Sequence, residues 1–468
     1  MLKRRTKIVA TISSLSCSVE LIRKLHAAGM NVARLNTAHM TTEEAVILVK
    51  NIREVSDSIA IMIDTKGPNV RVCNLSAPKQ VNVGDVLTVS GSSVPGDAGF
   101  QVNYAHFGIE VKPGQRIVVD DGAVVLEVLE RRGDGLKCSV VSGGLLKDKK
   151  SVNVPNAELR VPALTKKDRE FIDFAVVNNL DFIAHSFVRG RDDVMALQSI
   201  LDTYESPIRI IAKIENRQGV DNLPEILDMA YGVMVARGDL GIEIPLEEVP
   251  IIQKRIIFEC MRRHKPVITA TQMLQSMETC SRPTRAEVSD VANAVMDGTD
   301  AVMLSGETAN GAYPVESIEM MARIVLETEK SPINLFTKSE QTQNNGSVRD
   351  YMVWAAVESS RRLDVKGIVC NTDTGKSCNM CAAYRGRIPI FGLAYNATVC
   401  RQLALTYGVR PVLMVHDTDP HKLLRSSIAK LLDQGMVMPQ DRVVLIGQFE
   451  AQSPTTDLIS IVRPAEVM

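Results

Sequence analysis

The sequence predicts an α/β protein built on a (β/α)8 TIM barrel, with an inserted small β-barrel lid domain and a C-terminal α/β domain. Eight short, β-branched apolar segments alternate with helical segments over about 250 residues, which is typical of such a barrel. Short alternating strands interrupt the series after its third strand. A further α/β unit follows a polar span at 337–347.

The first 64 residues already show the repeat. Strands are expected at 7–12, 31–36 and 59–64, and a helix from Ser18 to Met30 separates the first two. Thr41 and Glu44 form a capping box, the usual start of a helix, between the second and third strands. Three strands and two helices in so short a span indicate βα units.

A lid domain is expected at 72–158, where the helical segments stop. Its strands are predicted at 81–89, 116–119, 123–129 and 137–141, separated by turns rich in Gly and Asp. An insertion at a βα loop leaves the barrel topology intact and places the new domain over the C-terminal face of the barrel.

The barrel domain, 1–71 and 159–336, resumes at a second capping box formed by Thr165 and Asp168. The remaining strands are expected at 181–187, 209–215, 232–237, 267–271 and 301–305, with helices at 249–263 and 285–296 among them. Every strand but the first ends in polar groups: Arg34, Asn36, Asp64, Lys66, Ser186, Lys213, Glu215, Arg237, Asp239, Thr271 and Ser305. Their convergence predicts an active site at the C-terminal mouth.

The C-terminal domain, 348–468, is expected to be regulatory or to serve assembly. A helix at 349–362 and strands at 367–371, 389–393, 411–415 and 442–446 outline it. It carries no sequence cluster of acid, base and metal-type residues.

The composition favours a small-molecule partner. With 54 basic and 55 acidic residues, the chain has no net field that would attract nucleic acid or an anionic membrane. Nine irregularly spaced cysteines indicate reduced thiols, and no segment resembles a signal peptide or a membrane span. We therefore expect a soluble, cytoplasmic protein.

Lys213 and Glu215 stand two residues apart at a strand end, so both side chains point to the same side. Asp239, expected at the end of the neighbouring strand, adds a second carboxylate, and Gly238 and Gly241 leave amides uncovered for an anion. The pattern predicts a site for a divalent cation and a phosphate. A structural ion pair at a sheet end is the alternative, and these residues alone leave it open.

Two motifs lie in the C-terminal domain. The turn at 372–377 resembles the tail of a P-loop, but Cys370 replaces the upstream glycine, so Walker A is rejected. A phosphate site and an ordinary N-cap turn remain as alternatives for Thr372, Thr374, Gly375, Lys376 and Ser377. Cys378 and Cys381 have CxxC spacing without a second pair, which favours structural thiols over zinc.

Eight segments together resemble the bacterial pyruvate kinase family over nearly the full chain. They are Arg34–Asn36, Asp64–Pro68, Val119–Gly122, Ala212–Asn216, Met234–Gly241, Thr269–Met273, Arg282–Glu287 and Asp297–Glu307. The resemblance implies a homotetramer that transfers the phosphoryl group of phosphoenolpyruvate to ADP and then protonates the enolpyruvate, the final step of glycolysis.

The same resemblance implies roles for individual residues. Glu215 and Asp239 would hold Mg²⁺ or Mn²⁺, Lys213 and Arg34 would offset the charge of the phosphoryl group, and Thr271 would stand where the proton arrives. The substrate would also meet Ala236, Arg237, Gly238 and Asp239. The nucleotide would meet Asn36, His39, Arg71, Lys150 and Lys167, although a hydrogen-bonded loop histidine is an alternative for His39.

The chain departs from the family pattern around the monovalent-cation site. Asn36, Asp64 and Thr65 match it, but Ala38 replaces a serine, Met40 replaces a glycine, and Asn69 stands where potassium users carry Glu and potassium-independent members carry Lys. Ser13 and Ser14 replace an early Gly-Pro near the expected nucleotide contact. These changes bear on potassium dependence and nucleotide affinity.

Three functions are compatible with the motifs. The first is pyruvate kinase activity, with a phosphorylated sugar as a candidate effector at 372–377. The second is a metal-dependent lyase or aldolase acting on pyruvate-like enolates, and the third is a regulatory paralogue with weak catalysis. Pyruvate formation from phosphoenolpyruvate and ADP, with and without K⁺, separates them.

Overall fold

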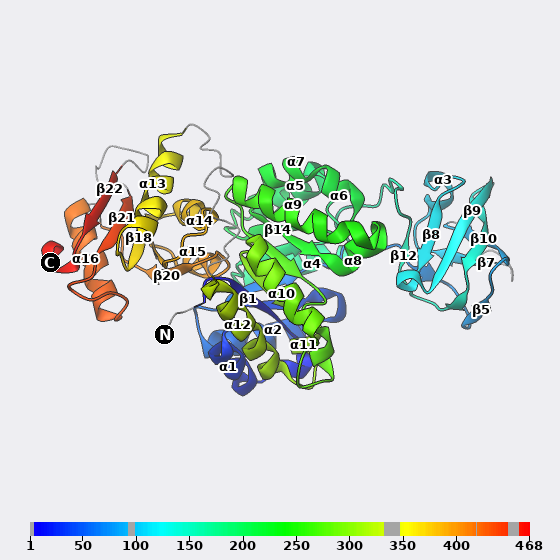
Figure 1. The fold of residues 1–468 in the computed structure, drawn as a ribbon. Helices are drawn as coiled ribbons and strands as arrows, with labels where there is room; N and C mark the ends of the chain where they lie inside the picture. The colour runs from blue at the N-terminus through cyan, green and yellow to red at the C-terminus, as the bar shows by residue number, and fades with distance from the viewer. Residues whose placement is uncertain (1–3, 92–98, 332–346, 418, 448–457) are drawn as a thin grey trace.

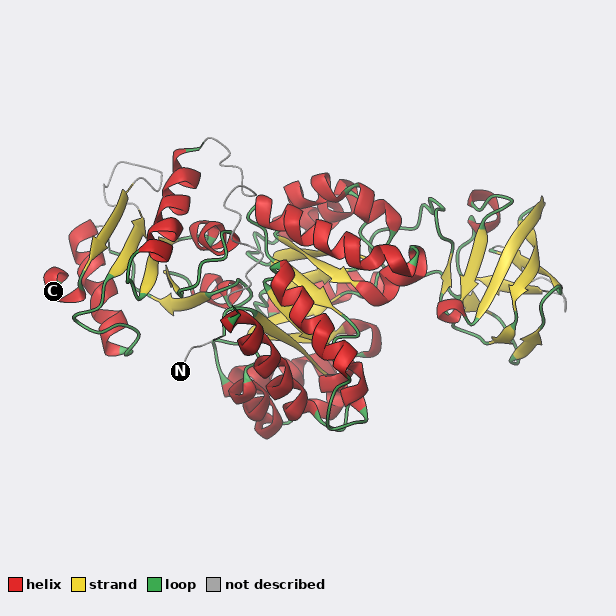
Figure 2. Cartoon of the chain, viewed as in Figure 1, coloured by secondary structure: helices red, strands yellow, loops and turns green. Residues whose placement is uncertain are grey.

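The computed structural model describes residues 4–91, 99–331, 347–417, 419–447 and 458–468. Three bodies lie in a row, with the barrel in the centre, the all-β insert on one side and the C-terminal α/β unit on the other (Figure 1). Figure 2 shows helices around the strands of the central body and almost none in the insert. No helix in the described ranges is both long and apolar enough to span a bilayer.

Eight parallel strands close into the central barrel in the order β1-β17-β16-β15-β14-β13-β3-β2. They are β1 (Lys7–Ile12), β2 (Val32–Asn36), β3 (Ala60–Asp64), β13 (Phe182–His185), β14 (Arg209–Ile214), β15 (Gly232–Ala236), β16 (Val267–Ala270) and β17 (Ala301–Leu304). The predicted (β/α)8 fold is therefore confirmed.

Helices cover the outside of this ring. They are α1 (Val19–Ala28), α2 (Thr42–Val55), α4 (Lys166–Val177), α5 (Arg191–Thr203), α7 (Leu223–Met229), α9 (Val249–Arg262), α10 (Arg285–Asp297) and α12 (Pro314–Lys330). Short helices α6 (Arg217–Asp221), α8 (Arg237–Glu243) and α11 (Gly306–Ala309) follow three of the strands. Both predicted capping boxes, Thr41 with Glu44 and Thr165 with Asp168, start α2 and α4.

The insert is a small barrel of short strands. Its main sheet runs β12-β8-β9-β10-β6-β7-β4, and an antiparallel bridge between Arg71 and Ser151 joins its two ends. The strands are β4 (Val72–Cys73), β6 (Val86–Ser90), β7 (Gly99–Val102), β8 (Arg116–Val119), β9 (Val124–Arg132), β10 (Gly135–Ser142) and β12 (Val152–Asn153). One short helix, α3 (Phe107–Glu110), packs beside them.

The prediction of a single strand at 81–89 is wrong. It is two strands, β5 (Lys79–Val81) and β6, because the chain turns between Asn82 and Asp85. The amide of Asp85 donates to the carbonyl of Asn82, and the Asp85 carboxylate accepts from the Asn82 amide. Gly84 between them takes a φ of +91°, which glycine adopts at low cost. β5 then pairs with β11 (Gly144–Leu146) instead of continuing into β6.

The C-terminal unit has a five-stranded sheet in the order β20-β19-β18-β21-β22. Its strands are β18 (Gly367–Thr372), β19 (Ile390–Ala394), β20 (Val409–Leu413), β21 (Val443–Gly447) and β22 (Leu458–Val462). Its helices are α13 (Val348–Arg362), α14 (Lys376–Ala383), α15 (Ala397–Leu403), α16 (Pro420–Asp433) and α17 (Pro464–Val467). The antiparallel β22 was not predicted. The linker predicted at 337–347 lies, except for Ser347, outside the described residues.

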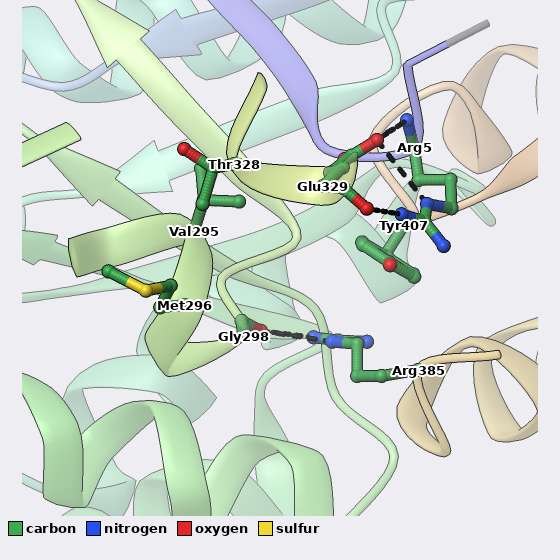
Figure 3. Close-up of a pocket in the computed structure, with 8 residues that line it drawn as sticks. All are labelled: Arg5, Val295, Met296, Gly298, Thr328, Glu329, Arg385 and Tyr407. Carbon is green, nitrogen blue, oxygen red and sulfur yellow. Dashed lines mark hydrogen bonds and ion pairs between the residues drawn. The ribbon is translucent and has the colours of Figure 1, made fainter. Parts of the chain in front are cut away.

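The C-terminal unit closes the N-terminal end of the barrel. Ala404 and Leu405 join the apolar cluster inside the ring of strands. Arg385, almost fully buried, donates to the carbonyl of Gly298 at 3.0 Å and pairs with Asp300 at 2.8 Å. Figure 3 shows a pocket at this junction, where Arg5 pairs with Glu329. Its volume of about 10 Å³ has room for roughly one water molecule, so the junction is packed shut.

Candidate active site

Lys213 lies at the end of β14 and is held by three oxygens. Its Nζ is 2.7 Å from the Ser186 hydroxyl, 3.0 Å from Asp64 Oδ1 and 2.9 Å from Glu215 Oε1. Burial disfavours the ammonium, but Asp64, Glu215 and Asp239 outweigh it and raise the pKa of Lys213 above its usual value. The ammonium is therefore charged and fixed in position at neutral pH.

Glu215 is fully buried and its two oxygens differ. Oε2 accepts a hydrogen bond from the amide of Phe187 at 2.6 Å. Oε1 is close to Lys213 Nζ but is not in hydrogen-bonding geometry, so this buried oxygen has no hydrogen-bond partner in the described structure. Burial, opposed by Lys213 and reinforced by Asp239, raises the pKa of Glu215 to about 7. A divalent cation at Oε1 would therefore share this oxygen with the Lys213 ammonium.

Asp239 is placed differently from the prediction. It lies in the first turn of α8, not on a strand, because the chain turns into a helix directly after Ala236. Its charge still acts on both Lys213 and Glu215. Within the described ranges its carboxylate takes part in no hydrogen bond or ion pair, which leaves it available to a ligand or a metal.

The glycine amides near Asp239 are not both uncovered, as the sequence had suggested. The Gly238 amide donates to the Thr271 hydroxyl at 2.9 Å. Gly241 lies inside α8. An anion at this turn would have to displace the Thr271 hydroxyl from the Gly238 amide.

Arg34 reaches the same cluster through Asp64. Its Nε pairs with Asp64 Oδ2 at 2.7 Å, and its Nη1 donates to the Thr11 hydroxyl at 2.9 Å. Burial alone would raise the pKa of Asp64, but Arg34 and Lys213 hold it below its usual value. The cluster then combines two cations with the three carboxylates of Asp64, Glu215 and Asp239. A divalent cation would make its net charge positive, which suits a phosphate.

Thr271 has an unusual backbone. Its φ is +66° and that of Gln272 is +55°, a left-handed conformation that is rare for a β-branched residue and is found where surrounding contacts enforce it. Arg237 supplies these contacts, since its Nη2 donates to the Thr271 carbonyl at 2.6 Å while its Nη1 pairs with Asp290 at 2.7 Å. The Arg237 guanidinium therefore positions Thr271. Of the substrate contact predicted for Arg237, only the backbone atoms of this residue remain available.

The residues predicted to meet a nucleotide form two groups. Near the barrel mouth, Lys167 Nζ is 3.3 Å from the Ala38 carbonyl, beside Asn36 and the exposed His39. In the lid, Arg71 Nη1 donates to the Lys149 carbonyl at 2.8 Å and Lys150 pairs with Asp120 at 2.9 Å. No hydrogen bond or ion pair joins the two groups among the residues that the structure describes.

The three residues predicted for a monovalent cation are engaged with the protein. Both Asp64 oxygens are bound, as described above, and Thr65 Oγ1 accepts from the Ser186 amide at 3.0 Å. The Asn36 side chain accepts from the Ala38 amide at 3.2 Å. Ala38 has no hydroxyl that could coordinate a monovalent cation.

At the predicted effector turn, the Gly375 amide donates to the Thr372 hydroxyl at 2.8 Å, and α14 starts at Lys376. Gly375 takes a φ of +82°. Cys370, Cys378 and Cys381 are buried free thiols beside it. Gly375 is the N-cap residue of α14 and has no side-chain cap hydrogen bond, and both alternatives for the turn stay open.

Sequence reasoning missed Thr11, Asp290 and the Phe187 amide. Thr11 follows the apolar run Ile8–Ala10 of β1 and donates to and accepts from groups at the barrel mouth, so a polar residue after this run was the available signal. Asp290 lies on α10, and nothing in the local sequence links it to Arg237. Ser305, although at a strand end, donates its amide to Glu307 at 2.7 Å and accepts from the Ala309 amide at 3.1 Å, and both bonds belong to the turn into α11.

A closed ring of parallel strands with an ammonium, a guanidinium and three carboxylates gathered at its C-terminal mouth is the arrangement of a (β/α)8-barrel enzyme. Residues 3–318 match the family model of the pyruvate kinase barrel domain, and residues 350–462 match that of the pyruvate kinase alpha/beta domain. The chain belongs to the pyruvate kinase family.

Individual relatives agree over nearly the whole length. A pyruvate kinase of Borreliella burgdorferi is 44% identical over 95% of this chain and 94% of its own. One of Geobacillus stearothermophilus is 43% identical over 98% of this chain and 80% of its own. A crystal structure of a pyruvate kinase from Cryptosporidium parvum superposes with a TM-score of 0.93, at 34% identity, and covers 98% of this chain and 96% of that one.

Proposed function

We propose that this protein is a phosphotransferase that moves the phosphoryl group of phosphoenolpyruvate to ADP, giving pyruvate and ATP. The observation that carries the proposal is the charge arrangement around Lys213. A fixed ammonium paired with two carboxylates, Asp64 and Glu215, suits phosphoryl transfer, which needs charge neutralisation more than covalent catalysis.

Glu215 and Asp239 are the residues that would hold Mg²⁺ or Mn²⁺. The donors fit, because one Glu215 oxygen lacks a hydrogen-bond partner and the Asp239 carboxylate is free in the described structure. No group of three or more His, Cys, Asp or Glu side chains in the described ranges could hold a metal by itself. Two carboxylates are the usual protein share for Mg²⁺, whose other ligands are water and substrate oxygens. When bound, the ion would neutralise negative charge on the substrate.

Side chains of this chain would supply the remaining interactions with the substrate. Arg34, held in place by Asp64 and Thr11, would bind the phosphoryl oxygens in a fixed orientation. Lys213 would offset the negative charge that develops on the phosphoryl group and on the enolate oxygen. The Thr271 hydroxyl, held by the Gly238 amide, would orient the water that delivers a proton to the methylene carbon.

For the nucleotide, we propose that the lid moves. Arg71 and Lys150 would approach Asn36, His39 and Lys167 when the lid swings toward the barrel mouth. This brings the cations of the two groups around the ADP phosphates and excludes water from the reaction.

Potassium, effector and assembly are further parts of the proposal. The family generally uses K⁺, and Asn36, Asp64 and Thr65 are the residues that would meet it here. A phosphorylated small molecule at Thr372, Thr374, Gly375, Lys376 and Ser377 is the proposed effector. Family membership also leads us to expect a cytoplasmic homotetramer.

The test is a coupled assay for pyruvate with phosphoenolpyruvate, ADP and Mg²⁺, with and without K⁺. Pyruvate formation in either condition supports the proposal. Its absence in both would remove it and favour a lyase, an aldolase or a regulatory paralogue. Changing Ala38→Ser together with Asn69→Glu should increase the stimulation by K⁺, because it restores the cation pattern of potassium users. An unchanged response would show that the cation site does not limit the rate.

A further inference from the structure

A cavity of about 100 Å³ lies where the lid joins the barrel. Its walls come from both chain segments that connect the two bodies, 68–70 and 151–161, and from barrel residues that include Phe187, Asn216 and Glu243. Lys213, Glu215, Asp239 and Thr271 are not part of the wall. The cavity is therefore a separate space from the catalytic cluster.

Most of the wall is apolar. Val70, Val152 and Val154 are buried there, and Leu159, Val161 and Phe187 complete the lining. Such a surface favours the short hydrocarbon part of a ligand, because contact with it removes apolar area from water.

Glu243 is the charged group in this wall without a counter-ion. One of its oxygens, Oε1, accepts from the Asn153 amide at 3.0 Å, and no ion pair involves Glu243 within the described ranges. Burial and the nearby charge of Asp239, opposed by the Asn153 hydrogen bond, raise the pKa of Glu243. Glu243 is half-buried and its carboxylate faces no cation of the described residues, so a cationic ligand in the cavity would gain an ion pair that the protein itself does not supply there.

The basic residue in the wall is already neutralised. Arg189 forms two hydrogen bonds with Asp193, at 2.9 and 2.8 Å, and donates to the Leu159 carbonyl at 2.8 Å. The side-chain amides of Asn69 and Gln218 also line the cavity, and neither has a hydrogen-bond partner in the described part of the chain. The unused groups of the wall are thus one carboxylate oxygen and two side-chain amides, each of which can turn its oxygen toward a cation.

We propose that this cavity binds a small primary alkylammonium, with its ammonium on Glu243 and the amide oxygens of Asn69 and Gln218 and its short aliphatic chain on the valines. The volume limits the ligand. An engineered cavity of about 150 Å³ holds benzene, so this one suits on the order of five non-hydrogen atoms.

An occupant of this cavity would fix the lid. It would contact both connecting segments and the barrel at once, next to the two hydrogen bonds that already join them, Asn153 to Glu243 and Arg189 to Leu159. The ammonium would therefore hold one lid orientation. This inference concerns binding and lid position, and it goes beyond the proposed reaction.

The experiment measures binding of n-butylammonium to the full chain by ligand-observed NMR, with Mg²⁺ present so that the active-site carboxylates do not compete. Butanol and butyrate, of matching size, are the neutral and anionic probes. We expect a dissociation constant on the order of 1 mM for the ammonium and at least tenfold weaker binding of both other probes. Hydrogen exchange across 151–161 should slow when the ammonium is bound.

Glu243→Gln keeps the shape and removes the charge, and it should weaken binding at least about tenfold. Ala157→Leu, which fills the cavity from the lid side, should also abolish binding and serves if the first variant fails to fold. The matched control is Glu247→Gln, the same charge change at an exposed position outside the wall. The proposal is overturned if butanol binds as tightly as butylammonium, or if Ala157→Leu binds like the Glu247→Gln control.

Discussion

Replacing Lys213 by Met tests the assignment of this ammonium most directly. Met keeps the length of the side chain but removes the charge that lies within 3.0 Å of Ser186, Asp64 and Glu215. One electrostatic donor of this kind contributes about 10²–10³ to turnover, or about 3–4 kcal/mol of barrier. Because Lys213 is proposed to face both the phosphoryl group and the enolate, we expect a loss of about 10³ or more, mostly in kcat.

The fold should survive this change. Asp64 keeps its pair with Arg34, and Glu215 keeps the Phe187 amide. Glu215 loses the ammonium that lowers its pKa, so it takes up a proton instead of remaining as an uncompensated charge. The destabilisation is then expected to stay at or below about 3 kcal/mol, the lower end for a broken buried ion pair.

The assay is steady-state pyruvate formation together with thermal unfolding. The matched control is Lys254→Met, which removes the same charge from a partly exposed pair with Asp297 on the outside of the barrel. The control should keep turnover within about twofold. A Lys213→Met enzyme that unfolds cooperatively yet loses less than tenfold in kcat would refute the role given to this residue.

Three further predictions concern the metal, the domain junction and the proton step. Because burial raises the pKa of Glu215 to about 7, a proton competes with Mn²⁺ for this carboxylate below that pH. The affinity for Mn²⁺, measured by electron paramagnetic resonance, should rise up to about tenfold per pH unit between 5 and 7 and level off above pH 7. An affinity that does not change with pH would contradict the assignment of Glu215 as a metal ligand. Arg385→Met leaves Asp300 buried without its cation and should lower the free energy of unfolding, measured by calorimetry, by about 3–5 kcal/mol. The control Arg362→Met, at an exposed ion pair, should lower it by less than about 1 kcal/mol. Equal effects of the two changes would argue against a buried junction between the domains. Thr271→Val should reduce turnover about 10²-fold, whereas Thr271→Ser, which retains the hydroxyl, should stay near the original rate. An equal loss of turnover in both variants would show that Thr271 acts through its packing and not through its hydroxyl.

The barrel was predictable because its strands are buried and stop in polar residues. The predicted start and end of β1 match the structure, and each of the other strands differs from its predicted bounds by one residue at one end, except β13, which starts one residue later and ends two residues earlier. The lid was harder because its strands are short, and the single strand predicted at 81–89 ran through Asn82, Gly84 and Asp85 although these residue types favour a turn. β22 was missed because it is an edge strand with only partly buried side chains, so it lacks a clear inward face.

At the site, the pairing of Lys213 with Glu215 followed from the two-residue period of a strand. The link from Lys213 to Asp64 could not be derived this way, because 149 residues separate them and only closure of the barrel brings them together. The same holds for Arg237 with Asp290 and for the left-handed backbone of Thr271. Asp64 was assigned to a monovalent cation by resemblance, yet its closest partners in the structure are Arg34 and Lys213.

Strand β13 connects the two functional ends of the barrel. Before its first residue, Asp181 pairs with Arg401 of α15 at 2.6 Å and with Arg53 at 3.1 Å. Directly after its last residue, Ser186 holds Lys213 and the Phe187 amide holds Glu215. The strand is four residues long and buried throughout, so it moves as one piece. A displacement of α15 in the C-terminal unit would therefore reach both Lys213 and Glu215 through a single rigid element, and the proposed effector of that unit would have a short physical route to the proposed active site.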